Sequence, residues 1–184
     1  MKKLIALLLA LVMVAGVFVA CDKTTEEENN APAAVEKTPI ADDMETVVNA
    51  IVEANPVEFM GGVMPVDLTD TSEDGLWMIQ NYTGLQNADK IEDIAVFEPM
   101  MGSLAFSLVL VRVNDAAEAQ TVAQEMSDNI DTRKWICVEA DEKIVAGYSD
   151  VVMLIMLDST TGLSAQSFVD TFATVAGGEL DFTI

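Results

Sequence analysis

The sequence contains no histidine and few cations. Lys and Arg total 9 against 31 Asp and Glu, which gives a formal net charge of −22 over 184 residues. Without imidazole, the chain has no Ser-His-Asp or Cys-His catalytic arrangement and no histidine ligand for zinc. Nine cations among 31 anions also exclude the basic face that meets phosphates, so no nucleic-acid partner is expected.

Cysteine is scarce as well, because the chain has only Cys21 and Cys137. Cys137 belongs to the apolar run Trp135-Ile136-Cys137-Val138, which predicts a strand. Free cysteine is among the residue types most often buried, whereas a reactive thiol has a cationic neighbourhood. The sequence therefore predicts that Cys137 is a buried and inert thiol.

Apolar residues are abundant, at 51% of the chain, and many of them lie in the first twenty positions. Met1-Lys2-Lys3 is a short basic start, and residues 4–19 form an unbroken run of apolar or small residues. This pattern is typical of a secretory signal, and it is short for a membrane span, which needs about 20 apolar residues.

The residues at the end of this run, Phe18-Val19-Ala20-Cys21, resemble a lipobox, the processing signal of bacterial lipoproteins. The resemblance implies that Cys21 carries lipid and begins the mature chain at the extracytoplasmic face of the cell membrane. Phe18 departs from the aliphatic residue usual at its position. An ordinary signal with a chance cysteine, or an uncleaved anchor, are the alternatives.

The chain after the signal divides into two parts. Residues 21–41 are acidic, with Glu26-Glu27-Glu28 and two prolines, and predict a flexible tether. Residues 42–184 have the apolar periodicity of a single folded domain. We therefore expect a signal peptide over 1–20, a tether over 21–41 and a domain over 42–184.

The periodicity of the domain predicts an α+β fold, with an antiparallel or mixed sheet of four or five strands packed with helices. The run 151–157 is apolar at every position, so it predicts a central strand covered on both faces. Residues 59–65 are expected to form a loop with a hinge at Gly61-Gly62. The expected helices span residues 44–52, 72–82, 114–130 and 164–176; the expected strands span 91–97, 104–113, 135–138, 144–148 and 151–157, with a short edge strand within 180–184.

Two stretches, FEPMMGSLAFSLVLVRV at 97–113 and DNIDTRKWICV at 128–138, carry a resemblance together with the strand at 151–157. They resemble a family of small uncharacterised lipoproteins from Gram-positive anaerobes, described only as a domain of unknown function. The similarity covers about residues 43–158. It implies a lipid-anchored extracytoplasmic α+β domain, and it provides no catalytic residues.

One segment has the spacing of a metal loop. Asp70, Ser72 and Asp74 alternate ahead of Gly75, as oxygen ligands do at the start of an EF-hand calcium loop. The twelfth position should be a bidentate Glu and is Asn81. The alternative is an Asp/Ser-rich turn that caps the following helix. The sequence requires no cofactor, and calcium is a possible one.

Methionine provides a second candidate site. The Met100-Met101 pair and the Gly61-Gly62 pair, which Met60 and Met64 flank, predict an adaptable methionine surface for an apolar ligand or peptide. Thioethers also bind Cu(I), and filling of the core is the third interpretation.

A third candidate is Arg133-Lys134-Trp135, the only basic cluster in the predicted domain. Its cations could hold an anion or a carboxylate of a partner protein. Capping or snorkelling at the start of a strand is the alternative.

These observations favour a non-catalytic binding or interaction module on the outer face of a membrane, with a protein or peptide partner. The sequence has no nucleophile motif and no phosphate-binding glycine loop. The alternatives are a cell-envelope enzyme that uses carboxylates and a structural lipoprotein that calcium stabilises.

Overall fold

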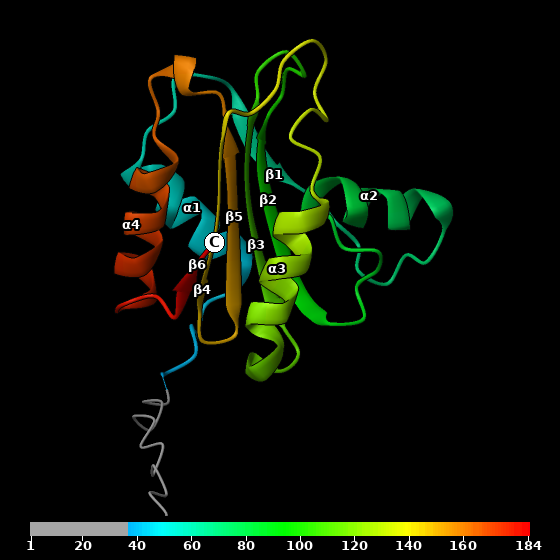
Figure 1. The fold of residues 1–184 in the computed structure, drawn as a ribbon, viewed down its shortest axis with the longest axis vertical. Coiled ribbons are helices and arrows are strands. Elements are labelled where there is room, and N and C mark those ends of the chain that lie inside the picture. The colour runs from blue at the N-terminus through cyan, green and yellow to red at the C-terminus, as the bar shows by residue number, and fades with distance from the viewer. Residues whose placement is uncertain (1–36) are drawn as a thin grey trace, which may run out of the picture. The chain divides into compact units, whose positions relative to one another are not determined.

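The structure, a computed structural model, describes residues 37–184. The predicted signal, Cys21 and the tether up to residue 36 lie outside the described residues. The described chain folds into one sheet with helices on both faces (Figure 1). The helices are α1 (Met44–Ala54), α2 (Glu73–Thr83), α3 (Ala119–Asn129) and α4 (Ala165–Ala176), and the strands are β1 (Gly61–Met64), β2 (Ile91–Pro99), β3 (Phe106–Val113), β4 (Glu142–Tyr148), β5 (Val151–Leu157) and β6 (Phe182–Thr183).

The six strands lie in the order β1-β2-β3-β5-β4-β6, and all neighbours are antiparallel. The predicted α+β class is confirmed. Of the two expected kinds of sheet, antiparallel or mixed, the structure has the antiparallel one, with six strands against the four or five expected. None of the described helices is both long enough and apolar enough to cross a bilayer.

The centre of the sheet is the β3–β5 pair, in register from Phe106 opposite Leu157 to Arg112 opposite Val151. All seven residues of β5 are buried, which confirms the prediction of a central strand covered on both faces. Because side chains alternate along a strand, Leu108 and Leu110 point to one face and Val109 and Val111 to the other. Each face therefore needs its own helical cover.

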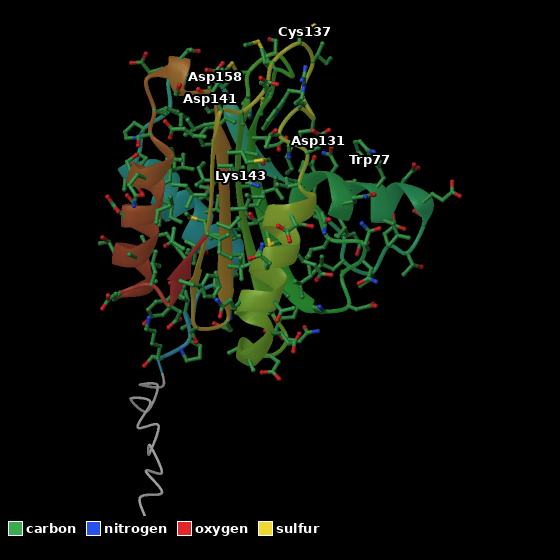
Figure 2. All side chains as sticks on the ribbon, in the orientation of Figure 1. Trp77, Asp131, Cys137, Asp141, Lys143 and Asp158 are labelled. Atoms are coloured by element: carbon green, nitrogen blue, oxygen red, sulfur yellow. The ribbon has the colours of Figure 1, made fainter. Side chains whose placement is uncertain are left out.

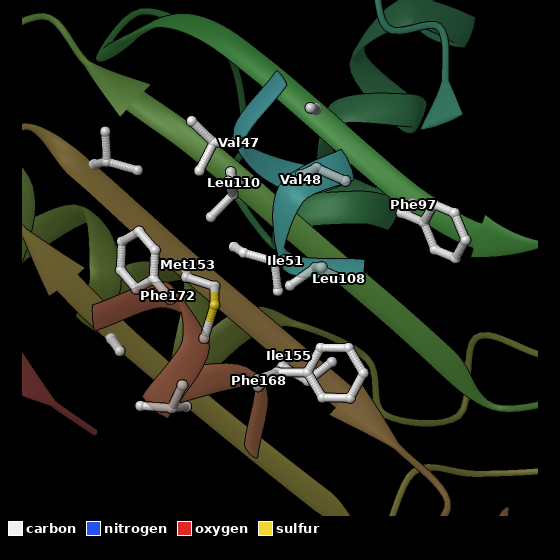
Figure 3. Close-up of a cluster of buried hydrophobic side chains, with 14 of the residues drawn as sticks. Val47, Val48, Ile51, Phe97, Leu108, Leu110, Met153, Ile155, Phe168 and Phe172 are labelled. Carbon is white, nitrogen blue, oxygen red and sulfur yellow. The ribbon is translucent and has the colours of Figure 1, made fainter. Parts of the chain in front are cut away.

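Helices α1 and α4 cover the first face and together bury the cluster of Figure 3, including Ile51, Phe168 and Phe172. Helix α3 covers the other face with Val122 and Met126, and α2 contributes Ile79 there. These buried positions follow the predicted helical spacing.

Helix α1 also begins where the sequence predicts, since the Asp43 carboxylate accepts a hydrogen bond from the backbone N–H of Thr46 at 2.8 Å.

Strand β1 was predicted as a loop, because glycine weakens a strand. The structure explains the difference through Phe97, whose ring packs over Gly61. A Cβ on Gly61 would lie 2.7 Å from that ring, so the ring can pack this closely only because residue 61 has no side chain. The glycine thus permits packing at the sheet edge.

The strand predicted over 135–138 is wrong, and so is the buried Cys137. These residues belong to a loop, Cys137 has φ 64°, and its side chain is exposed. An apolar run of four residues does not distinguish a strand from a loop that covers a core. The edges of β3 and β5 are already occupied by β2 and β4, so no central position is left for another strand.

Packing of the domain begins before residue 42, where the sequence analysis placed its start. Ile40 is buried, and the Arg112 guanidinium donates hydrogen bonds to the carbonyls of Ile40 and Asp42 at 2.9 and 2.7 Å. Lys37 forms an ion pair with Asp181 at 2.8 Å, beside the β4–β5 turn. The described chain therefore begins at the end of the sheet where β3 finishes.

Candidate functional site

The opposite end of the sheet is built by three separate segments. The backbone N–H of Met100, after β2, donates to the carbonyl of Met60, before β1, at 2.9 Å. The N–H of Ile136 donates to the carbonyl of Gly102 at 2.9 Å, which joins the loop before β4 to the β2–β3 turn. We define the sheet tip as Met60, residues 100–103 and residues 131–140.

Large apolar side chains at the sheet tip are exposed to solvent. Met60, Met100, Met101 and Ile136 are 75, 65, 61 and 72% exposed. Among the described residues, only one other large apolar side chain exceeds 60%, Trp77 on α2 at 61%. Single exposed apolar residues are ordinary, whereas a group of four from three segments is informative.

A hollow of about 390 Å³ lies in the loop 131–140, lined by Arg133, Trp135, Cys137, Val138 and Glu139. The Arg133 guanidinium and the Glu139 carboxylate form an ion pair across 3.2 Å. Cys137 lies at the outer end of this loop (Figure 2). The volume is in the range of small-ligand sites.

A buried cation, the ammonium of Lys134, joins the sheet tip to the rest of the domain. The Lys134 ammonium lies 2.6 Å from the Glu98 carboxylate, with side chains only 5 and 14% exposed. It donates hydrogen bonds to the Asn81 carbonyl at 3.1 Å and to the Ser107 hydroxyl at 3.3 Å. Lys134 therefore ties the loop 131–140 to α2, β2 and β3 at once.

Two aromatic rings enclose this cation, and burial changes the titration of the group. The ammonium lies 5.0 Å from the ring centroid of Tyr82 and 5.3 Å from that of Trp135. Burial lowers the pKa of Lys134, and the negative charge of Glu98 opposes that change. Burial also raises the pKa of Tyr82, and the charge of Glu98 adds to the effect.

The structure brings the predicted partner-binding residues together at the sheet tip but gives them different environments. Met100 and Met101 are exposed, and Arg133 is exposed and paired with Glu139. Lys134 is buried and paired with Glu98, so its charge is not exposed at the surface. Trp135 is partly buried and packs against the core.

Sequence reasoning missed the groups that complete this arrangement. Ile136 was hidden in a run predicted as a strand, and Glu98 and Ser107 were not linked to Lys134. One signal was available, because Ser107 is a polar residue inside an otherwise apolar strand. A buried hydroxyl needs a hydrogen-bond partner, and the partner proves to be the lysine.

The calcium candidates lie away from the sheet tip, at the start of α2. The Asp70 carboxylate accepts from the N–H of Ser72 at 2.9 Å, and the Ser72 hydroxyl accepts from the N–H of Gly75 at 3.2 Å. Hydrogen bonding by Ser72 lowers the pKa of Asp70. These bonds form the turn and helix cap that was the alternative interpretation.

Asp74 lies in the first turn of α2. Over residues 37–184, no three or more Cys, Asp or Glu side chains form a metal-binding group. Calcium binding at Asp70, Ser72 and Asp74 stays a prediction.

Several polar groups at this end of the sheet already have structural partners. Ser107 lies near a lysine, but its side chain is fully buried, and the lysine is paired with Glu98. The Asp141 carboxylate accepts from the N–H and the hydroxyl of Ser159 at 2.7 and 2.6 Å. Asp158 caps the next turn through the N–H of Thr160. These bonds hold the turns and the loop at this end of the sheet.

No protein-family model, curated protein or solved structure matches this chain. The proposal for its function therefore depends on the sequence pattern and on the geometry described above.

Replacement of one partner of the buried ion pair tests its role. We expect Glu98→Gln to destabilise the domain, by up to about 3–5 kcal/mol in chemical denaturation, because it leaves the Lys134 ammonium buried without a counter-ion. The double variant Glu98→Gln/Lys134→Met removes both charges and should recover most of this loss. Equal stability of wild type and the single variant, or no recovery in the double variant, would contradict the assignment.

Proposed function

We propose that this protein is a lipid-anchored, extracytoplasmic binding module whose sheet tip holds an apolar partner surface. The observation that carries the proposal is the exposure of Met60, Met100, Met101 and Ile136 at one end of the sheet. Four apolar side chains in water cost free energy, which a partner recovers by covering them.

The location of the sheet tip, at the end of the sheet opposite the start of the described chain, supports this function. Lys37 lies beside Asp181 at one end of the sheet, whereas the sheet tip lies beyond the other end of β3 and β5. A strand of seven or eight residues spans about 25 Å. If lipid on Cys21 holds the chain to a membrane, the apolar side chains belong to the end farther from the point where the described chain begins.

Methionine suits such a surface. Its unbranched thioether chain adapts to different shapes and is common on surfaces that bind several partners. The sheet tip has three methionines, while the strands beneath it are packed with branched aliphatic residues. The arrangement combines an adaptable surface with a rigid support, as a binding module requires.

A neutral apolar dye tests the binding surface. We expect the soluble domain from residue 37 to increase the fluorescence of Nile red, and Met100→Ser/Met101→Ser/Ile136→Ser to abolish most of the increase. Exposed positions tolerate such changes with little loss of stability, which circular dichroism would verify. The matched control Leu76→Ser/Trp77→Ser removes apolar groups from α2 and should keep the signal. An unchanged signal in the sheet-tip variant would overturn the proposal.

The anchor has a separate test in a bacterial host that processes lipoproteins. We expect the full chain to incorporate radiolabelled palmitate and to fractionate with membranes. Cys21→Ala removes the thiol that would be acylated, so the label should be lost. Label retained in Cys21→Ala, or no label in the wild type, would contradict lipid anchoring and leave the dye experiment unaffected.

A further inference from the structure

The charge of the domain is strongly one-sided. Residues 37–184 contain six Lys and Arg against 26 Asp and Glu, a net charge of −20. Such a field attracts cations and repels anions over about a Debye length, roughly 8 to 10 Å at physiological salt. The charge alone does not specify a binding site, so the local arrangement decides what it attracts.

Almost every described cation is already used inside the domain. Five of the six form ion pairs, and the sixth, Lys143, donates to the carbonyl of Ser127. The ion pairs are Lys37 with Asp181, Lys90 with Glu118 and Glu125, Arg112 with Asp150, Arg133 with Glu139, and Lys134 with Glu98. The described surface therefore has few positive charges left to balance its other carboxylates.

The same imbalance holds around the sheet tip. Arg133 is its exposed cation, and Glu139 neutralises it. Asp141 and Asp158 lie at the same end of the sheet as Cys137 (Figure 2). The N–H of Asp158 donates to the Ala105 carbonyl, next to the β2–β3 turn, and Glu58 is exposed two residues before Met60. The exposed apolar side chains and these carboxylates thus lie at the same end of the sheet.

The charge of the Asp141 carboxylate persists at neutral pH. Hydrogen bonds from the hydroxyl and N–H of Ser159 lower the pKa of Asp141. A ligand that covered the apolar group with an acidic segment would place like charges together, whereas a basic segment would meet opposite charges.

We infer that the sheet tip binds a cationic amphipathic segment of a partner protein. Its apolar side chains would cover Met60, Met100, Met101 and Ile136, and its Lys or Arg side chains would face Glu58, Asp141 and Asp158. This inference rests on the proposed function and adds the chemistry of the partner. A membrane rich in anionic lipids is a poorer occupant, because the carboxylates repel its headgroups.

Three synthetic peptides of 14 residues test the inference. They share one helical pattern of leucines and carry Lys, Gln or Glu at all other positions. Their binding to the soluble domain from residue 37 would be measured by fluorescence anisotropy at low and high salt. We expect the Leu/Lys peptide to bind at least about tenfold more tightly than the Leu/Gln peptide, with the difference reduced by salt. The Leu/Glu peptide should bind most weakly.

Two sets of variants locate the binding. The variant Met100→Ser/Met101→Ser/Ile136→Ser should bind the Leu/Lys peptide about tenfold or more weakly, as expected when a central apolar anchor is lost. The variant Asp141→Asn/Asp158→Asn keeps an acceptor oxygen on each side chain. It should weaken binding of the Leu/Lys peptide and leave binding of the Leu/Gln peptide unchanged. The control Glu53→Gln/Asp170→Asn makes the same change of net charge on α1 and α4 and should have a smaller effect.

The outcomes separate the inference from the proposed function. Equal binding of the Leu/Lys and Leu/Gln peptides, lost in the sheet-tip variant, would overturn the cationic partner and support an apolar binding surface. Leu/Lys binding that the sheet-tip variant leaves unchanged would mean general attraction to the acidic surface, which also overturns the inference. So would failure of every peptide to bind, or preferential binding of phosphatidylglycerol vesicles at the sheet tip.

Discussion

The structure depends on one constraint, the burial of the central β3–β5 pair on both faces. Strand β5 has no exposed residue, and β3 is buried at all but one of its positions. Two adjacent strands of this kind need apolar cover above and below, which α1 and α4 provide on one side and α3 on the other. The faces of the sheet are therefore used for stability, and the ends of the strands remain for function.

The two polar residues of β3 mark those ends. Arg112 holds the segment that enters the domain, through the carbonyls of Ile40 and Asp42. Ser107 meets the ammonium of Lys134, which holds the loop 131–140 at the sheet tip. A buried ion pair is a weak source of stability but a strong constraint on geometry, since neither charge tolerates the loss of its partner. We interpret the Lys134–Glu98 pair as a positioning device for the exposed apolar side chains.

The sequence predicted the regular parts of the fold well and the sheet tip poorly, for physical reasons. Helical spacing in α1, α3 and α4 and the uninterrupted apolar run of β5 are local signals, and they identified their elements correctly. Strand β1 depends on a phenylalanine ring packed over Gly61, a contact between distant residues. The environment of Lys134 also comes from separate segments, so the sequence could place Met100, Met101 and Arg133 near a surface but could not show that Lys134 is buried.

The proposed binding surface requires a preformed sheet tip, held by the Lys134–Glu98 ion pair and by the hydrogen bond from the Ile136 N–H to the Gly102 carbonyl. Amide hydrogen exchange of the wild-type domain, followed residue by residue across low denaturant concentrations, tests it most directly. We predict that the amide of Ile136 is protected from exchange, because its N–H donates a hydrogen bond to the Gly102 carbonyl. Exchange of Ile136 at the rate of an unfolded peptide would contradict a preformed surface.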